Sequence, residues 1–179
     1  MANDAGKQFE KDIQDSANKY KNMYIYRLRD SANAWNPTQN DNIRFTPTNI
    51  CDFVLVEDDS PLTLFLEMKT TKNTSLPYSM LKKNQIDGLK NISDLNFKHL
   101  KGGFIFNFRK YETTFYLSGA QICEYMKLSE QEGFKYNKKS FSYEWVKDNG
   151  LEIKGIIKRV HYRYVLDEFV KDLVKTTEE

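Results

Sequence analysis

The sequence predicts an α/β fold in which a mixed central β-sheet is flanked by helices. Segments with apolar residues at helical spacing alternate along the chain with short runs rich in β-branched and aromatic residues. The predicted order is one helix, three strands, a second helix, two strands, a third helix and a tail of mixed character, which is typical of layered α/β domains. The 179 residues are enough to bury a core, and we expect a single domain over residues 1–179.

Each predicted element rests on a local pattern. In the first helix, Phe9, Ile13 and Ala17 recur on one face, and Asp4 is a suitable cap. Residues 30–50 are rich in Asn, Pro, Thr and Asp without a clear period, so we expect a long loop there. The turn sequence EDDSP joins the next two strands into a hairpin. The helices are expected at 4–20, 80–92, 118–128 and 166–175, the strands at 23–29, 51–57, 62–69, 102–108 and 113–118, and strand-like character at 151–164.

The composition indicates a soluble protein of a reducing compartment. Hydrophobic residues make up 40% of the chain, yet no apolar run approaches the roughly 20 residues of a membrane span. Cys51 and Cys123 are far apart and lack metal-ligand spacing, which indicates a reduced, cytoplasmic protein. The net charge is only +2, so a polyanion such as DNA would have to be bound by locally placed charges.

Three charged side chains mark the ends of two apolar strands. Asp52 stands near the start of one expected strand and Glu67 near the end of the next, so an antiparallel pair would bring them side by side. Lys69 follows Glu67 by two residues, which places both side chains on one face of a strand. Carboxylates suit Mg²⁺ or Mn²⁺, which can activate a water, and Lys69 can orient that water beside a phosphate. The pattern therefore favours a metal-dependent enzyme that cuts phosphodiesters.

Other interpretations of these residues stay open at this level. The pattern is short enough to occur by chance, and charges at strand ends are common on protein surfaces. The apolar setting of Asp52 and Glu67 favours the functional interpretation, because a buried carboxylate is costly without a cation. Glu10 borders the apolar face of the first helix and is either solvated or a further metal ligand. Gln85 lies between apolar residues of the second helix and needs a partner, either a metal-bound water, a phosphate or a backbone carbonyl.

Five segments of the chain carry a family resemblance. They are GKQFEKDIQDSANKY, CDFVLV, LFLEMKTTKNTSLPYSMLKKNQIDGL, GGFIFNF and TTFYLS, and they span most of residues 6–128. In this order they resemble the RecU-type Holliday junction resolvases of the PD-(D/E)XK nuclease superfamily. The resemblance implies a restriction-endonuclease-like fold and a homodimer that resolves four-way DNA junctions by paired nicks, with Mg²⁺ or Mn²⁺, in DNA recombination and repair.

The same resemblance assigns roles to single residues. It implies that Glu10, Asp52 and Glu67 hold the metal, that Lys69 is the catalytic lysine, and that Gln85 is the glutamine of the following helix that supports the site. The sequence also departs from the family. Ile50 and Cys51 stand where the family usually has threonines, and Asn84 stands where it has histidine. Residues 30–50 occupy the place of the family's protruding stalk with a different sequence and less length, so we expect a loop or a reduced stalk.

A compact variant of this kind would suit a bacteriophage-encoded resolvase. Basic side chains around the predicted site are candidates for DNA contacts, although each is equally compatible with a solvated surface; they are Arg44, Lys72, Lys82 and Lys83. The stretch KRVHYRY at 158–164 is the densest basic and aromatic segment and is either a DNA contact or an exposed edge strand.

Two other functions remain as alternatives at this level. One is a nuclease of the same superfamily that acts on flaps, ends or duplex sites. The other is a non-catalytic DNA-binding or regulatory module, against which the intact set of Asp52, Glu67 and Lys69 argues, because a binding module has no need for it.

Overall fold

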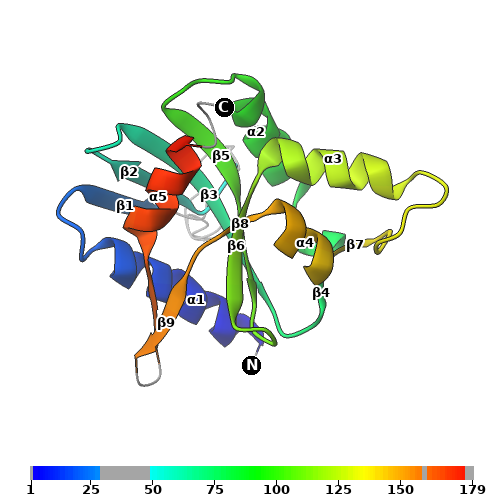
Figure 1. The fold of residues 1–179 in the computed structure, drawn as a ribbon, viewed down its shortest axis with the longest axis horizontal. Helices are drawn as coiled ribbons and strands as arrows, with labels where there is room; N and C mark the ends of the chain where they lie inside the picture. Colours follow the sequence, from blue (N-terminus) through cyan, green and yellow to red (C-terminus); the bar gives the residue numbers. More distant parts are fainter. Residues whose placement is uncertain (1, 29–48, 159–160, 176–179) are drawn as a thin grey trace, which may run out of the picture.

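A computed structural model describes residues 2–28, 49–158 and 161–175 of the chain (Figure 1). The described helices are α1 (Ala2–Ala17), α2 (Lys83–Asp94), α3 (Gly119–Ser129), α4 (Tyr143–Asn149) and α5 (Leu166–Lys175), with a short 3₁₀ turn at Tyr78–Met80. The described strands are β1 (Met23–Arg27), β2 (Phe53–Glu57), β3 (Leu62–Thr71), β4 (Ser75–Pro77), β5 (Leu100–Phe108), β6 (Thr113–Ser118), β7 (Ser140–Ser142), β8 (Leu151–Glu152), β9 (Gly155–Lys158) and β10 (His161–Tyr164).

A mixed six-stranded sheet forms the centre of the fold. Its strands lie in the order β1-β2-β3-β5-β6-β8. β3 and β5 are parallel, whereas the other neighbours are antiparallel. The predicted mixed central sheet flanked by helices is therefore confirmed, with β8 added at one edge by the tail that the sequence marks only as strand-like.

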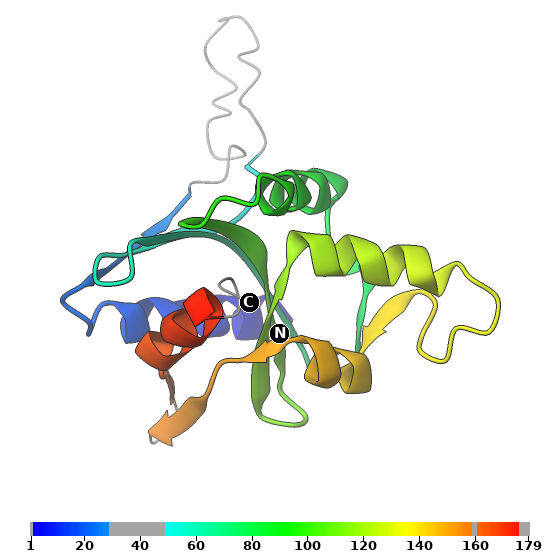
Figure 2. The same ribbon diagram turned by 45° about the horizontal axis from the view of Figure 1, so that its top comes forward.

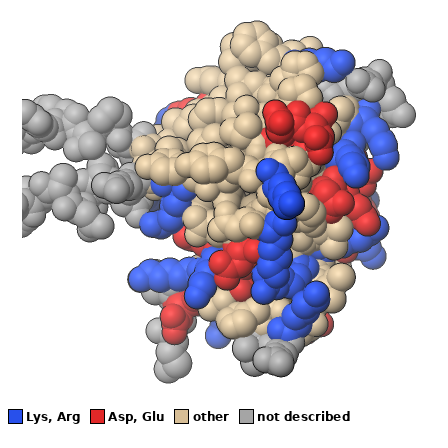
Figure 3. Space-filling model, turned by 90° about the vertical axis from the view of Figure 1, so that its left-hand side faces the viewer, with Lys and Arg blue, Asp and Glu red and all other residues tan. Residues whose placement is uncertain are grey.

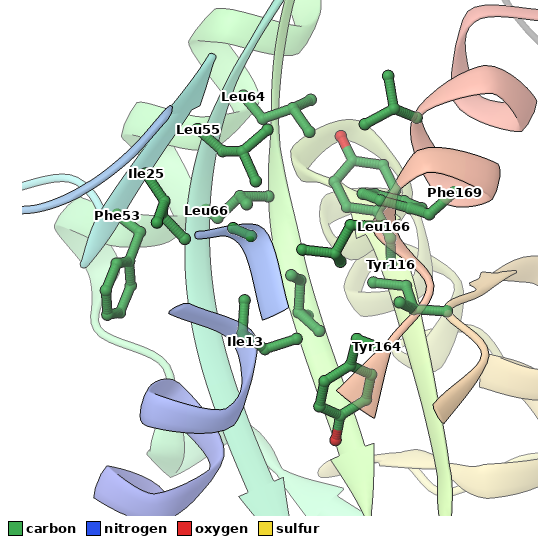
Figure 4. Close-up of a cluster of buried hydrophobic side chains, with 14 of the residues drawn as sticks. Ile13, Ile25, Phe53, Leu55, Leu64, Leu66, Tyr116, Tyr164, Leu166 and Phe169 are labelled. Carbon is green, nitrogen blue, oxygen red and sulfur yellow. The ribbon is translucent and has the colours of Figure 1, made fainter. Parts of the chain in front are cut away.

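Helices cover both faces of the sheet, and each face has its own hydrophobic core (Figure 2). On one face, Ile13 of α1 and Phe169 of α5 belong to the same buried cluster as Leu66 of β3 (Figure 4). On the other face, Leu89 of α2 and Tyr125 of α3 are fully buried with the phenylalanines of β5. β3 lies inside the sheet between β2 and β5, so the strand that carries Glu67 and Lys69 is held from both sides.

The element order up to α3 agrees with the prediction, except that the short strand β4 and the 3₁₀ turn stand between β3 and α2 and that several element ends differ. α1 begins at Ala2, so Asp4 lies in the first turn, where its charge favours the helix dipole, and is not the cap. Ser118 caps α3, because its hydroxyl accepts a hydrogen bond from the Gln121 N–H at 3.2 Å. β1 and β2 are shorter than the predicted strands 23–29 and 51–57.

The part after α3 differs most from the prediction. It contains β7, the short helix α4, β8 and a two-stranded ribbon of β9 and β10. α4 spans only 7 residues, which is too short for a helical period to stand out in the sequence. None of the described helices combines the length and the apolar character needed to cross a membrane.

Candidate active site

The pairing of β2 with β3 fixes Asp52 beside Glu67. Phe53 is paired with Leu66, and the strands are antiparallel, so the next position in each direction places Asp52 opposite Glu67. The backbone N–H of Asp52 donates to the carbonyl of Leu66 at 3.2 Å, and the Asp52 carbonyl accepts from Leu28 N–H at 2.8 Å. Asp52 is thus anchored between β1 and β3 at the point where β2 begins. The two carboxylates lie on the same side of the sheet, as the strand pattern predicts.

Glu67 and Lys69 form a tight pair on β3. Lys69 Nζ donates to Glu67 Oε1 at 2.5 Å, and the side chain of Glu67 is fully buried while that of Lys69 keeps 18% of its surface exposed. The second carboxylate oxygen, Oε2, is buried and has no hydrogen-bond partner among the described residues. Lys69 therefore satisfies one oxygen of Glu67 and leaves the other without a donor.

The electrostatics of Glu67 follow from this geometry. Burial raises its pKa to about 7, the Lys69 ammonium opposes this rise, and the neighbouring Asp52 carboxylate reinforces it. Two facing carboxylates can only accept hydrogen bonds when both are ionised, so the pair needs either a shared proton or a cation between them. The unpartnered Oε2 therefore fits a hard divalent cation, for which carboxylate oxygen is the preferred ligand.

Glu10 lies at the edge of this pair and is held by an arginine. Its Oε2 is 3.3 Å from Nε of Arg27 on β1. Burial raises the pKa of Glu10, as does Asp52, whereas Arg27 and Lys69 lower it, so Glu10 is within electrostatic reach of both Asp52 and Lys69. Sequence reasoning did not find Arg27 as a site residue. The feature that identifies Arg27 is the pairing of β1 with β2, which places Arg27 opposite Phe53 and therefore next to Asp52.

The carboxylates are not gathered into a ready-made three-ligand cluster. Among the described residues, no group of three or more His, Cys, Asp or Glu side chains is placed closely enough to hold a metal ion. The reason is that Glu10 is turned onto Arg27 while Asp52 and Glu67 face each other. Asp52 and Glu67 are thus the pair that would hold a cation, with Glu10 beside them.

Gln85 has a structural partner that the sequence did not predict. Its side-chain oxygen accepts a hydrogen bond from the backbone N–H of Lys82 at 3.1 Å, which caps the first turn of α2. The partner is a backbone N–H and not the carbonyl considered from the sequence. The side chain is buried, so this cap fixes the start of α2, and a supporting role of Gln85 in the site stays a prediction.

The predicted DNA-contacting lysines are exposed. Lys72 follows the end of β3, and Lys82 and Lys83 lie at the start of α2. Lys83 Nζ is engaged by the carboxylate of Asp87 one turn later, at 2.5 Å, a pair that is largely solvated. Arg44 lies outside the described residues.

Comparisons with known proteins identify a family and two similar proteins. Residues 4–168 match the family Recombination protein U (RecU). The SPbeta prophage-derived uncharacterized protein YotM of Bacillus subtilis (strain 168) is 28% identical over 183 residues, which cover 97% of this chain and 89% of that protein. A solved structure of Hjc, a Holliday junction resolvase of Archaeoglobus fulgidus, aligns with 82% of this chain and 95% of its own at 15% identity and a TM-score of 0.48.

The family match covers nearly the whole chain, from the first turn of α1 into the start of α5. It includes every element that carries Glu10, Asp52, Glu67 or Lys69. It confirms the RecU-type resemblance predicted from the sequence and supports the predicted function of a Holliday junction endonuclease. The chain belongs to the RecU family.

Proposed function

We propose that this member of the RecU family resolves four-way DNA junctions by hydrolysis that depends on Mg²⁺ or Mn²⁺, with Asp52, Glu67 and Lys69 as its catalytic set. The observation that carries the proposal is the pair of half-buried Asp52 and fully buried Glu67, whose unpartnered oxygen belongs to a carboxylate that also binds an ammonium group. A bound divalent cation would supply an activated water and offset negative charge on the reacting phosphate.

The side chains then have distinct tasks. Asp52 and Glu67 provide the negative charge that attracts the cation, and Glu10 adds a third carboxylate at the edge. Lys69 keeps part of its surface exposed, so its ammonium can donate to a phosphate oxygen or to the attacking water while it orients Glu67. Arg27 holds Glu10 in place until DNA or a cation competes for the carboxylate.

The wider context is part of the same proposal. Paired nicks on opposing strands need two active sites, so we propose a homodimer, which light scattering after gel filtration can measure. Lys72, Lys82 and Lys83 are proposed to contact phosphates of the junction arms, as is Arg44. The similarity to a prophage-derived protein supports a phage-encoded origin, and we propose that the enzyme acts in the cytoplasm, where its DNA substrate lies.

The proposal is tested with labelled four-way junction, flap and linear duplex, each incubated with Mg²⁺ or with EDTA. We expect symmetric nicks in the junction, little cutting of the duplex, and none with EDTA. The variants Asp52→Asn and Glu67→Gln remove one charge each and keep the side-chain shape, and both should abolish cutting. Glu124→Gln, which alters an exposed carboxylate on α3, is the matched control and should cut normally. Cutting by Asp52→Asn at the normal rate would refute the assigned site. Preferential cutting of flaps or duplex would show that the junction is not the preferred substrate.

A further inference from the structure

A cavity lies between the end of α1 and the β9–β10 ribbon, away from the catalytic carboxylates. Its volume is about 200 Å³, and its polar lining includes Ser16, Lys19, Tyr20, Lys158 and Arg163. Glu10 lies in the middle of α1, whereas Lys19 lies in the turn that follows the end of this helix at Ala17. The proposed catalytic chemistry uses none of these residues.

Three cationic side chains line this cavity. In the part of the chain that the structure describes, Lys19, Lys158 and Arg163 have no carboxylate within ion-pair distance. Partial loss of hydration lowers the pKa of Lys19, the nearby Arg163 and Lys158 lower it further, and the Asp15 carboxylate opposes these effects without cancelling them. Nε of Arg163 is buried and lacks a hydrogen-bond partner among the described residues, while Nη1 donates to the Asp15 carbonyl at 3.4 Å.

The wall of the cavity is fixed by packing. The backbone N–H of Tyr164 donates to Ser16 Oγ at 3.0 Å, and that of Tyr162 donates to Asp12 Oδ2 at 3.3 Å, so β10 is fastened along α1. Tyr164 is itself buried in the core. Arg163 stands between these two anchored residues, and its side chain lines the same cavity as Lys19. Like charges held together in this way favour the binding of an anion.

We propose that the cavity of Lys19, Lys158 and Arg163 binds a phosphate group of the DNA backbone, at a point on a junction arm away from the cut. This inference rests on the proposed function for the identity of the anion. The seven residues from Glu10 to the end of α1 at Ala17 correspond to about 10 Å along the helix, with Lys19 in the turn just beyond, and one turn of DNA is about 34 Å. A duplex arm that reaches the catalytic site therefore has further phosphates at the distance of the cavity.

The surface between the two places suits such a path. Lys7 and Lys11 are exposed on α1, the helix that carries Glu10 and ends just before Lys19. Figure 3 shows the side of the molecule where α1 ends and the chain turns into β1, and basic side chains project there in several groups with acidic ones between them. The stretch 158–164, which the sequence marks as a DNA contact or an exposed edge strand, supplies two of the three cations.

The test measures binding without cleavage. The double variant Lys19→Gln, Lys158→Gln changes two exposed side chains, and Lys147→Gln, Lys171→Gln on α4 and α5 removes the same charge elsewhere as the matched control. Fluorescence anisotropy with labelled four-way junction and labelled duplex is recorded in EDTA from 50 to 200 mM NaCl. Loss of one phosphate contact lowers the slope of log affinity against log salt by about 0.9, so the ratio of unaltered to variant affinity should fall about 3.5-fold over this range.

The possible results separate the inference from the proposed function. A reduced slope on both DNAs, with an unchanged slope for the control variant, supports the cavity. Equal slopes for the cavity variant and the unaltered protein overturn it, whatever the nuclease assay shows. Chemical-shift changes at Lys19 and Arg163 on addition of inorganic phosphate, with equal DNA slopes, would also overturn it, since the site would then serve a small anion. If the slope changes but the protein does not cut junctions with Mg²⁺, the proposed function is wrong and the proposed phosphate site in the cavity stands.

Discussion

The substitution Glu67→Gln should change how stability depends on pH in the absence of a divalent cation. The carboxyl group has a pKa of about 7 in the folded protein, against an ordinary value of 4.5. Between these values the unfolded chain has released the proton while the folded protein retains it, so stability falls as pH rises through this window. A pKa difference of about 2.5 corresponds to a loss of about 3 kcal/mol in the free energy of unfolding.

Glutamine does not ionise, so the variant should not show this loss. Urea denaturation in EDTA from pH 5 to pH 8 measures it: the unaltered protein should lose most of the 3 kcal/mol, and Glu67→Gln should follow a flatter curve. A divalent cation at about 100 times its dissociation constant should return about 2.7 kcal/mol to the unaltered protein and far less to the variant. The control Glu124→Gln should match the unaltered protein. Parallel curves for Glu67→Gln and the unaltered protein would show that the pKa of Glu67 is not raised in the folded protein.

Three further predictions concern the site and its supports. Lys69→Met should lower the single-turnover cleavage rate by about 10²- to 10³-fold with DNA affinity in EDTA nearly unchanged, because one donor to the reacting phosphate is lost; a normal rate contradicts this role. Arg27→Gln removes the cation that lowers the pKa of Glu10, so the acid limb of the cleavage pH profile should move to higher pH, and an unmoved limb would mean that Glu10 does not act in its ionised form. Gly119→Ala places a methyl group 2.3 Å from the backbone of α2 and should cost about 1–3 kcal/mol by urea denaturation. The added methyl group of Gly6→Ala meets nothing within 4 Å, so this variant should keep its stability. Equal stability of the two variants would contradict the close packing at Gly119.

Sequence reasoning found the central part of the fold because the patterns there are strong. The runs that became β2 and β3 are apolar and joined by a polar turn, so their pairing follows from local signals. That pairing alone brings Asp52 to Glu67, and period-two alternation brings Lys69 to the same face. These contacts connect neighbouring strands, which is why they could be predicted.

The contacts that were missed connect distant segments. The ion pair of Glu10 with Arg27 depends on how α1 crosses the sheet, which no spacing in the sequence reports. The cap that Gln85 forms with Lys82 needs the exact residue where α2 begins, and helix ends are the least certain part of a sequence-based prediction. Likewise, the cavity by Lys19 exists only because β10 lies along α1, more than 140 residues later in the chain.

The position of Lys69 has a consequence for how the enzyme meets its substrate. Lys69 and Glu67 stand on an interior strand that pairs with β5 over residues 63–71 and with β2 as far as Leu66, and such a strand cannot shift without breaking the sheet. We therefore expect the reacting groups to stay still during turnover. The adjustment that seats a phosphate among them must then come from the bending and opening of the DNA, which four-stranded branch points permit more readily than straight duplex.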